Sequence, residues 1–137
     1  MKLSTRSRYG TRLMVDLARH YEQGPVQIRD IASRQAISIK YLEQLIIPLK
    51  KAGFITSVRG PKGGHLLSKP PASITAGEIV RVLEKETSLV QCLEFPESCE
   101  RIEDCPTRNL WKRATRAFYD QLDDVTLAEL VADEQQC

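Results

Sequence analysis

Apolar residues in the first part of the chain recur at intervals of three and four, the pattern of amphipathic α-helices. The first such stretch runs from Thr5 to Tyr21, and Ser4 or Thr5 can cap its start. Its inward stripe would consist of Gly10, Leu13, Met14, Leu17, Ala18 and Tyr21. Gly24-Pro25 then breaks the chain, and the pattern predicts a shorter helix over 26–34 that buries Ile28, Ile31 and Ala32.

A turn at 35–37 leads to a third predicted helix, which Ser38 can cap. Its buried stripe would be Ile39, Leu42, Leu45, Ile46 and Leu49, leaving outward Lys40, Tyr41, Glu43, Gln44 and Ile47. Pro48 should kink or end this helix near Ile47, because proline removes an internal hydrogen bond and clashes with the preceding turn. A short helix, a tight turn and a longer helix with outward polar residues is the order of a helix-turn-helix.

After residue 53 the pattern changes to two short β-like runs, 54–58 and 65–68, joined by a glycine-containing connection that carries Arg59 and Lys62. This indicates a β-hairpin with a basic tip. Its glycines would let the backbone approach a surface closely, which suits a wing lying on a phosphate backbone or in the minor groove. A plain exposed hairpin is the alternative, but three helices followed by a basic hairpin is the winged-helix order.

The rest of the chain divides into further segments. Thr75 can cap a fourth helix that ends near Leu83, residues 88–108 lose helical periodicity, and Thr126 can cap a last short helix. Between them, 110–125 is predicted to be a long helix with one apolar stripe: Trp111, Ala114, Phe118, Leu122 and Val125. Little remains to cover this stripe, so we expect a homodimer in which it packs against its twin, with intrachain packing as the alternative.

The predicted fold is therefore mainly α with a small β-hairpin wing, that is, a winged helix-turn-helix domain plus a long C-terminal dimerisation helix. We expect the DNA-binding domain at 1–87, a cysteine loop that binds a cluster at 88–108, and the dimerisation helix with the C-terminal tail at 109–137.

Composition and charge narrow the function. The chain has 137 residues with 42% hydrophobic residues, enough for one domain, and no stretch typical of a secretion signal or a membrane span, so we expect a cytoplasmic protein. The net charge of residues 1–65 is +8 and that of 66–137 is −6. This division predicts that the first half binds a polyanion, namely double-stranded DNA. An enzyme is not expected, because no catalytic triad, phosphate loop or Cys-x-x-Cys pair is visible and no small-molecule substrate is indicated.

Specific side chains can be assigned to DNA reading. Lys40, Tyr41, Glu43 and Gln44 would enter the major groove from the third helix. Arg59 and Lys62 would contact the backbone from the wing, and Ser38 would contact a phosphate.

Three cysteines, Cys92, Cys99 and Cys105, lie within fourteen residues, and Cys137 lies far from them. Disulfides are not expected in a reducing compartment, whereas three thiolates on one loop could hold zinc, copper(I) or an iron-sulfur cluster. The spacing is wider than the Cys-x2-Cys of zinc loops, which favours a cluster over buried thiols or a redox pair. The fourth ligand stays open among a partner-subunit residue, a small external ligand and several residues of this chain: His20, Glu94, Glu103, Asp104 and Cys137.

Over about its whole length the chain resembles the IscR-type winged-helix iron-sulfur regulators, a group that includes NsrR and RirA. The resemblance is carried by residues 1–4 and 8–10, 37–45, 57–64, the three loop cysteines and 126–131. It implies a homodimeric bacterial repressor or activator that binds palindromic promoter DNA. It further implies that Cys92, Cys99 and Cys105 hold a cluster that reports cluster status, iron, nitric oxide or redox stress.

Arg108 stands where the IscR type has a histidine ligand, so the resemblance favours [4Fe-4S] over [2Fe-2S]. The alternative is a cluster-free winged-helix regulator controlled by a protein or metabolite partner, with the cysteines as thiol sensors.

Overall fold

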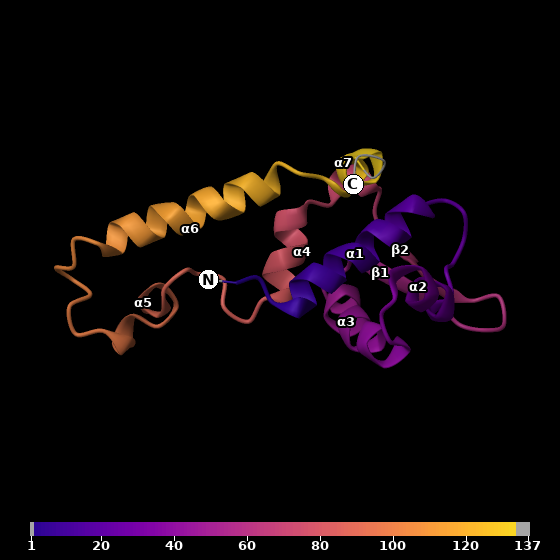
Figure 1. Cartoon of the computed structure of the whole chain (residues 1–137), viewed down its shortest axis with the longest axis horizontal. Helices are drawn as coiled ribbons and strands as arrows, with labels where there is room; N and C mark the ends of the chain where they lie inside the picture. The colour runs from indigo at the N-terminus through magenta and orange to yellow at the C-terminus, as the bar shows by residue number, and fades with distance from the viewer. Residues whose placement is uncertain (1, 134–137) are drawn as a thin grey trace.

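The computed structural model describes residues 2–133, which are mainly helical with one two-stranded antiparallel sheet, as predicted. In chain order the elements are α1 (Thr5–Arg19), α2 (Ile28–Gln35), α3 (Ile39–Lys51), β1 (Ile55–Val58), β2 (Gly64–Leu67), the 3-10 turn η1 (Pro71–Ser73), α4 (Ala76–Leu83), α5 (Gln91–Glu94), the 3-10 turn η2 (Pro96–Ser98), α6 (Arg108–Asp123) and α7 (Leu127–Asp133). Figure 1 shows α1 to α4, the hairpin and α7 gathered into one body, from which α6 and the segment around α5 extend as an arm.

One hydrophobic core holds this body together, and it takes side chains from α1, α2, α3, α4, the hairpin and α7. The stripe predicted for α1 is buried except for Tyr21, which is half-buried. Ile39 was expected in the stripe of α3, but this is wrong: its side chain is 43% exposed at the first position of the helix. The largest fully buried side chains include Leu13, Met14, Leu17, Ile31, Leu42, Leu45, Leu49, Ile74, Ile79 and Leu127.

The third helix does not end near Ile47. It continues through Pro48 to Lys51, so the predicted early end is wrong. Leu45 and Leu49, on either side of Pro48, are buried in the core. The free energy gained by burying these two side chains exceeds the loss of the single hydrogen bond that proline removes.

The predicted helix caps are confirmed, whereas α2 begins at Ile28 and not at 26. The Ser38 hydroxyl accepts from the Tyr41 amide at 3.1 Å, and the Thr126 hydroxyl accepts from the Glu129 amide at 3.2 Å. Thr75 and Glu78 form a reciprocal capping box at the start of α4. The turn before α3 is also confirmed, since Ala36 adopts a left-handed conformation with φ 54°.

The hairpin is confirmed, and it is attached to the body by backbone. Val26 forms an antiparallel bridge with His65, in which each amide donates to the other's carbonyl at 2.8 Å. Gly64, with φ 153°, makes this approach possible, because a Cβ there would lie 2.4 Å from the Val26 carbonyl oxygen. The predicted wing therefore has a fixed position relative to the helices.

The segment 88–108 was expected to lack helical structure, but it contains the short helix α5 and the turn η2. Beyond it, α6 packs on α4 and α5. Its apolar stripe is only partly covered: Trp111 is 39% exposed, and Ala114, Phe118, Leu122 and Val125 are half-buried. Tyr119, on another face, is the buried residue of α6.

After α6 the chain returns to the body. Thr75 and Thr126 form a backbone bridge, the Leu127 amide donates to the Ile74 carbonyl at 2.9 Å, and Leu127 is fully buried. As a result α7 packs against α1 and η1. Within residues 2–133, no helix combines the length and apolar character needed to cross a membrane.

Candidate DNA-binding surface and cysteine segment

The exposed face of α3 carries the predicted base-reading side chains. Lys40, Glu43 and Gln44 are exposed, and Ile47 is 66% exposed on the same helix. Ser38 lies at the N-terminus of α3, and its hydroxyl oxygen already accepts one hydrogen bond as the cap. These residues have the accessibility that major-groove contacts need.

Tyr41 differs from the expectation that it faces away from the core. It is half-buried, packs against the core, and meets the ring of Tyr9 edge-on, with ring centroids 5.9 Å apart at 89°. The guanidinium carbons of Arg8 and Arg12 lie 5.8 and 5.3 Å from the centroid of the Tyr9 ring. The start of α3 is thus flanked by two exposed arginines of α1.

Neither Arg8 nor Arg12 was among the side chains predicted from the sequence to contact DNA. They are four residues apart, so they lie on the same face of α1, and this spacing was the available signal. Arg12 is held toward the turn before α3, since its guanidinium donates to the Gln35 side-chain oxygen at 3.3 Å and also to the Gln35 carbonyl.

Arg59 and Lys62 are both exposed in the hairpin connection, as predicted. The tip is closed by a hydrogen bond from the Gly63 amide to the Gly60 carbonyl at 2.9 Å. The tip also contacts Gln27, the residue before α2, whose side-chain amide donates to the Pro61 carbonyl at 3.3 Å. Two cationic side chains therefore project from a turn whose backbone is restrained.

His65 lies inside the junction of wing and helices. Its Nδ1 is 2.8 Å from the Ser57 hydroxyl oxygen on the paired strand. Burial, together with the positive charge of Lys50, lowers the pKa of His65, while the Glu43 carboxylate opposes this shift. The lowered pKa favours the neutral ring, which forms a contact between the two strands through Ser57.

A buried carboxylate fixes α1 against α2. Asp16 is fully buried and accepts from Arg34 at 2.8 and 3.0 Å and from Gln35 at 3.0 Å. Burial alone would raise the pKa of Asp16, but the hydrogen bonds from Arg34 and Gln35 and the charge of Arg34 hold it below its ordinary value. This network sets the position of the turn that precedes α3.

The cysteine segment carries the proposed cofactor ligands. Cys92, Cys99 and Cys105 are free thiols and half-exposed. A hydrogen bond with the Thr107 hydroxyl, 3.2 Å from the Cys105 sulfur, favours the thiolate and lowers the pKa of Cys105. Within residues 2–133 the structure does not gather three or more cysteine, histidine or acidic side chains into a group that could hold a metal ion.

Among the candidates for a fourth ligand, Glu94 has a partner, because its carboxylate accepts from the Ser88 amide at 2.6 Å. His20 lies at the end of α1, where its Nδ1 is 2.8 Å from the Asp16 carbonyl oxygen. Cys137 lies outside the described residues.

Comparison with known proteins agrees with this arrangement. Residues 3–133 match the model of the Rrf2 family, described as an iron-dependent transcriptional regulator. The chain is 47% identical over 137 residues to the protein Rrf2 of Nitratidesulfovibrio vulgaris, covering 100% of this chain and 91% of that one.

Two solved structures of transcriptional regulators are similar to this chain along nearly its whole length. IscR of T. potens has a TM-score of 0.79 and 38% identity, covering 98% of this chain and 88% of that one. CymR of B. subtilis, described as the global cysteine regulator, has a TM-score of 0.79 and 41% identity, covering 96% and 97%.

Proposed function

Because this chain belongs to the Rrf2 family of transcriptional regulators, we propose that it is a homodimeric regulator that reads palindromic promoter DNA and responds to an iron-sulfur cluster. It is a DNA-binding winged-helix regulator and not an enzyme. The observation that carries the proposal is the exposed polar face of α3 beside the basic hairpin tip. As a DNA-binding protein it would act in the cytoplasm.

The side chains divide by the part of DNA they would contact. Lys40, Glu43 and Gln44 would meet base edges, because donors and acceptors on a helix in the major groove can distinguish base pairs. Tyr41 would contact DNA from the edge of this face, beside Tyr9. Ser38, Arg59 and Lys62 would contact phosphates, which position the protein without reading sequence.

The donor chemistry of the cysteine segment fits an iron-sulfur cluster. Three free, half-exposed thiols lie on one segment, and one of them, Cys105, favours the thiolate that a soft metal centre requires. Cys92, Cys99 and Cys105 would hold the cluster, with [4Fe-4S] favoured over [2Fe-2S]. When bound, the cluster would supply sensitivity to iron, nitric oxide or redox stress, and the segment would transmit its presence to α6 and α4.

The proposed dimer would use the apolar stripe of α6. Trp111 and Leu110 are 39% and 50% exposed, and they lie on the arm that extends from the body. Two copies related by a two-fold axis would present two α3 helices to a palindromic site, so symmetry of protein and DNA would match.

The test is anaerobic purification of the full chain followed by absorption spectroscopy, iron and sulfide analysis, and selection of DNA sequences from a random pool. We expect a coloured protein with about four iron atoms per chain for [4Fe-4S], or about two for [2Fe-2S], and selection of a palindrome. The Cys99→Ser variant should lose iron and change the affinity for that palindrome. A coloured protein that selects no sequence, or a Cys99→Ser variant that keeps both cluster and regulation, would contradict the proposal.

A second candidate is a cluster-free regulator that uses its cysteines as thiol sensors. The likeness to CymR, described as a cysteine regulator in B. subtilis, favours it, as does the lowered pKa of the Cys105 thiol. A colourless protein, purified from cells that build clusters, that still selects a palindrome and loses DNA affinity on treatment with peroxide would support this candidate.

A further inference from the structure

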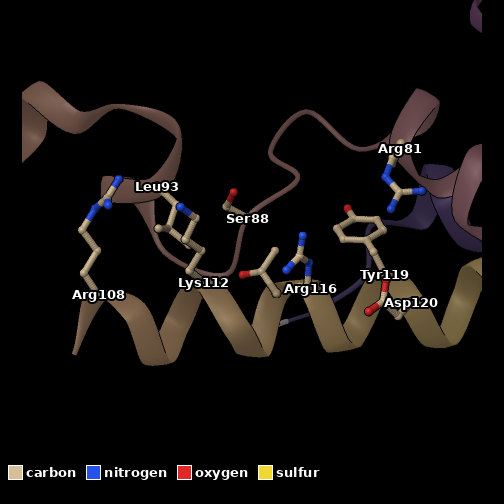
Figure 2. Close-up of a pocket in the computed structure, with 9 residues that line it drawn as sticks. Arg81, Ser88, Leu93, Arg108, Lys112, Arg116, Tyr119 and Asp120 are labelled. Atoms are coloured by element: carbon tan, nitrogen blue, oxygen red, sulfur yellow. The ribbon is translucent and has the colours of Figure 1, made fainter. Parts of the chain in front are cut away.

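A groove of about 430 Å³ lies between α6, the end of α4 and the segment that leads into α5. Figure 2 shows its lining side chains projecting from α6 toward Ser88 and Leu93, with Arg81 of α4 at one end. The lining residues are Arg81, Ser88, Leu93, Arg108, Lys112, Thr115, Arg116, Tyr119 and Asp120. The volume is in the range of sites that bind small molecules.

The two ends of the groove differ in charge. At the α4 end, Arg81 forms a two-point ion pair with Asp123, stacks over the ring of Tyr119, and has Asp120 nearby. From the other end to the middle of α6, the side chains of Arg108, Lys112 and Arg116 have no hydrogen-bonding or ion-pair partner among residues 2–133. The unbalanced positive charge therefore extends from the start of α6 to its middle.

Two features of α6 make this charge costly without an anion. Arg108, Lys112 and Arg116 follow one another at intervals of four, so like charges lie side by side on one helix face. The first turn contains no acidic residue, and a cation at a helix N-terminus opposes the helix dipole. A bound anion would relieve both repulsions.

An unsatisfied donor in the groove points to the same ligand. The Arg108 Nε is buried and has no hydrogen-bond partner in the part of the chain that the structure describes. A buried donor without a partner costs free energy, and guanidinium groups pair with phosphate and carboxylate in a two-point geometry. Because the Arg108 side chain lines the groove, an oxyanion bound there would pair with a guanidinium that lacks a partner within the described residues.

We propose that this groove binds a small multivalent oxyanion, either a phosphate-bearing molecule or a polycarboxylate, held by Arg108, Lys112 and Arg116. The site is distinct from the α3 and hairpin surface. In Figure 1, α4 lies between α3 and α6, and α4 contacts both helices. The apolar stripe of α6 lies on another face of the helix, so dimerisation through that stripe leaves the groove's cations on their own face.

Isothermal titration calorimetry of the full chain with inorganic pyrophosphate and, separately, with tricarballylate tests the proposal. We expect saturable binding of one or both, and the tighter probe assigns the ligand to the phosphate or the carboxylate class. The double variant Arg108→Gln, Arg116→Gln should weaken binding by about tenfold or more, because two charge-assisted contacts are lost.

Arg113→Gln is the matched control, since Arg113 is an exposed cation of α6 that does not line the groove. It should change the affinity less than about twofold. Equal weakening by the control and the double variant would mean general ionic attraction and would overturn the proposal. Thermal unfolding of each variant verifies that it is folded.

The competing occupant is an acidic segment of a second copy of the chain. If neither probe binds while the double variant changes the sedimentation coefficient, the cations pair with protein carboxylates and the proposal is wrong. Absence of binding with unchanged sedimentation also overturns it.

An effect of the anion on DNA affinity would rest on the proposed function. It is measured separately, as the change in affinity for the selected palindrome at saturating pyrophosphate. Failure to select any palindrome would contradict the proposed function and leave the calorimetric result standing.

Discussion

At the scale of single residues, Glu43 and Lys62 represent two different ways to bind DNA. Both side chains are exposed, Glu43 on α3 and Lys62 in the hairpin connection. A carboxylate can accept a hydrogen bond from cytosine N4 but repels phosphate, so it contributes to sequence preference more than to affinity. A lysine at the wing attracts every phosphate alike.

Glu43→Ala should therefore relax base preference at one position of the site by about 1 to 3 kcal/mol. Lys62→Ala should weaken binding to all sequences and flatten the dependence of affinity on salt. Fluorescence anisotropy on the selected palindrome and on single-base variants, at several salt concentrations, measures both. A uniform loss over all sequences for Glu43→Ala would remove Glu43 from base reading.

The buried Asp16 makes stability depend on Arg34. Arg34→Met leaves the fully buried carboxylate without its two-point partner, and we expect it to lower the free energy of unfolding by about 2 to 3 kcal/mol. Arg29→Met, an exposed arginine on the same helix, is the control and should change it by less than about 0.5 kcal/mol. Urea denaturation measures both, and equal effects would mean that the Asp16 contact contributes nothing.

His65 makes stability depend on pH. Its pKa is lowered in the folded state, so the unfolded chain binds more protons as the pH falls below about 6.5. The neutral ring therefore contributes to the free energy of unfolding above about pH 6.5, and this contribution is lost as the pH falls below that value. Denaturation at about pH 7.5 and pH 5.5 should show a larger loss for the natural chain than for His65→Gln. Equal losses would show that His65 titrates alike in both states.

At the scale of elements, local signals predicted where helices begin. Ser38, Thr75 and Thr126 cap their helices through bonds to residues three positions on, and such contacts are visible in sequence. The effect of Pro48 was not predictable in the same way, because it depends on the burial of Leu45 and Leu49 by elements distant along the chain.

The capping box of α4 should contribute measurably to stability. Thr75→Val removes the hydroxyl that accepts from the Glu78 amide at 3.2 Å, and we expect a loss of about 1 kcal/mol in the free energy of unfolding. Thr87→Val, at an exposed threonine outside the helices, serves as the comparison and should have little effect. If both variants unfold at the same urea concentration as the natural chain, the cap contributes nothing to the free energy of unfolding.

At the scale of the whole molecule, α4 connects the two proposed functional regions. It packs on α1 and α3 in the body and on α6 in the arm. The cysteine segment contacts α6 through α5, so a physical route from that segment to α3 would pass through α6 and then α4. The pair Arg81–Asp123, with contacts of 2.6 and 2.9 Å, fixes α4 to α6 at this junction.

Dimerisation is tested on the exposed end of the α6 stripe. Trp111→Glu should convert the proposed dimer to a monomer of about 15.5 kDa in analytical ultracentrifugation, because a charge would be buried at the interface. Arg113→Glu, on another face of α6, should stay dimeric. A natural chain that sediments as a monomer would contradict the dimer itself.

Some residues of the candidate sites could be predicted from the sequence, and others could not. The spacing of Lys40, Glu43 and Gln44 follows from helical periodicity alone, and it predicted their common exposed face. The position of Arg8 and Arg12 beside Tyr41 depends on how α1 packs on α3, and the groove depends on how α4 and Ser88 meet α6. Helical period predicts a face, but it does not predict what that face meets.

The burial of Leu127 has a consequence for synthesis on the ribosome. Leu127 lies in the same core as Leu13 and Leu17 of α1, although more than a hundred residues separate them along the chain. The body that carries α3 therefore cannot complete its core until translation has passed Leu127, after the cysteine segment and α6 have already been made. Nascent chains would thus contain the cysteine segment and α6 before the body that carries α3 is complete.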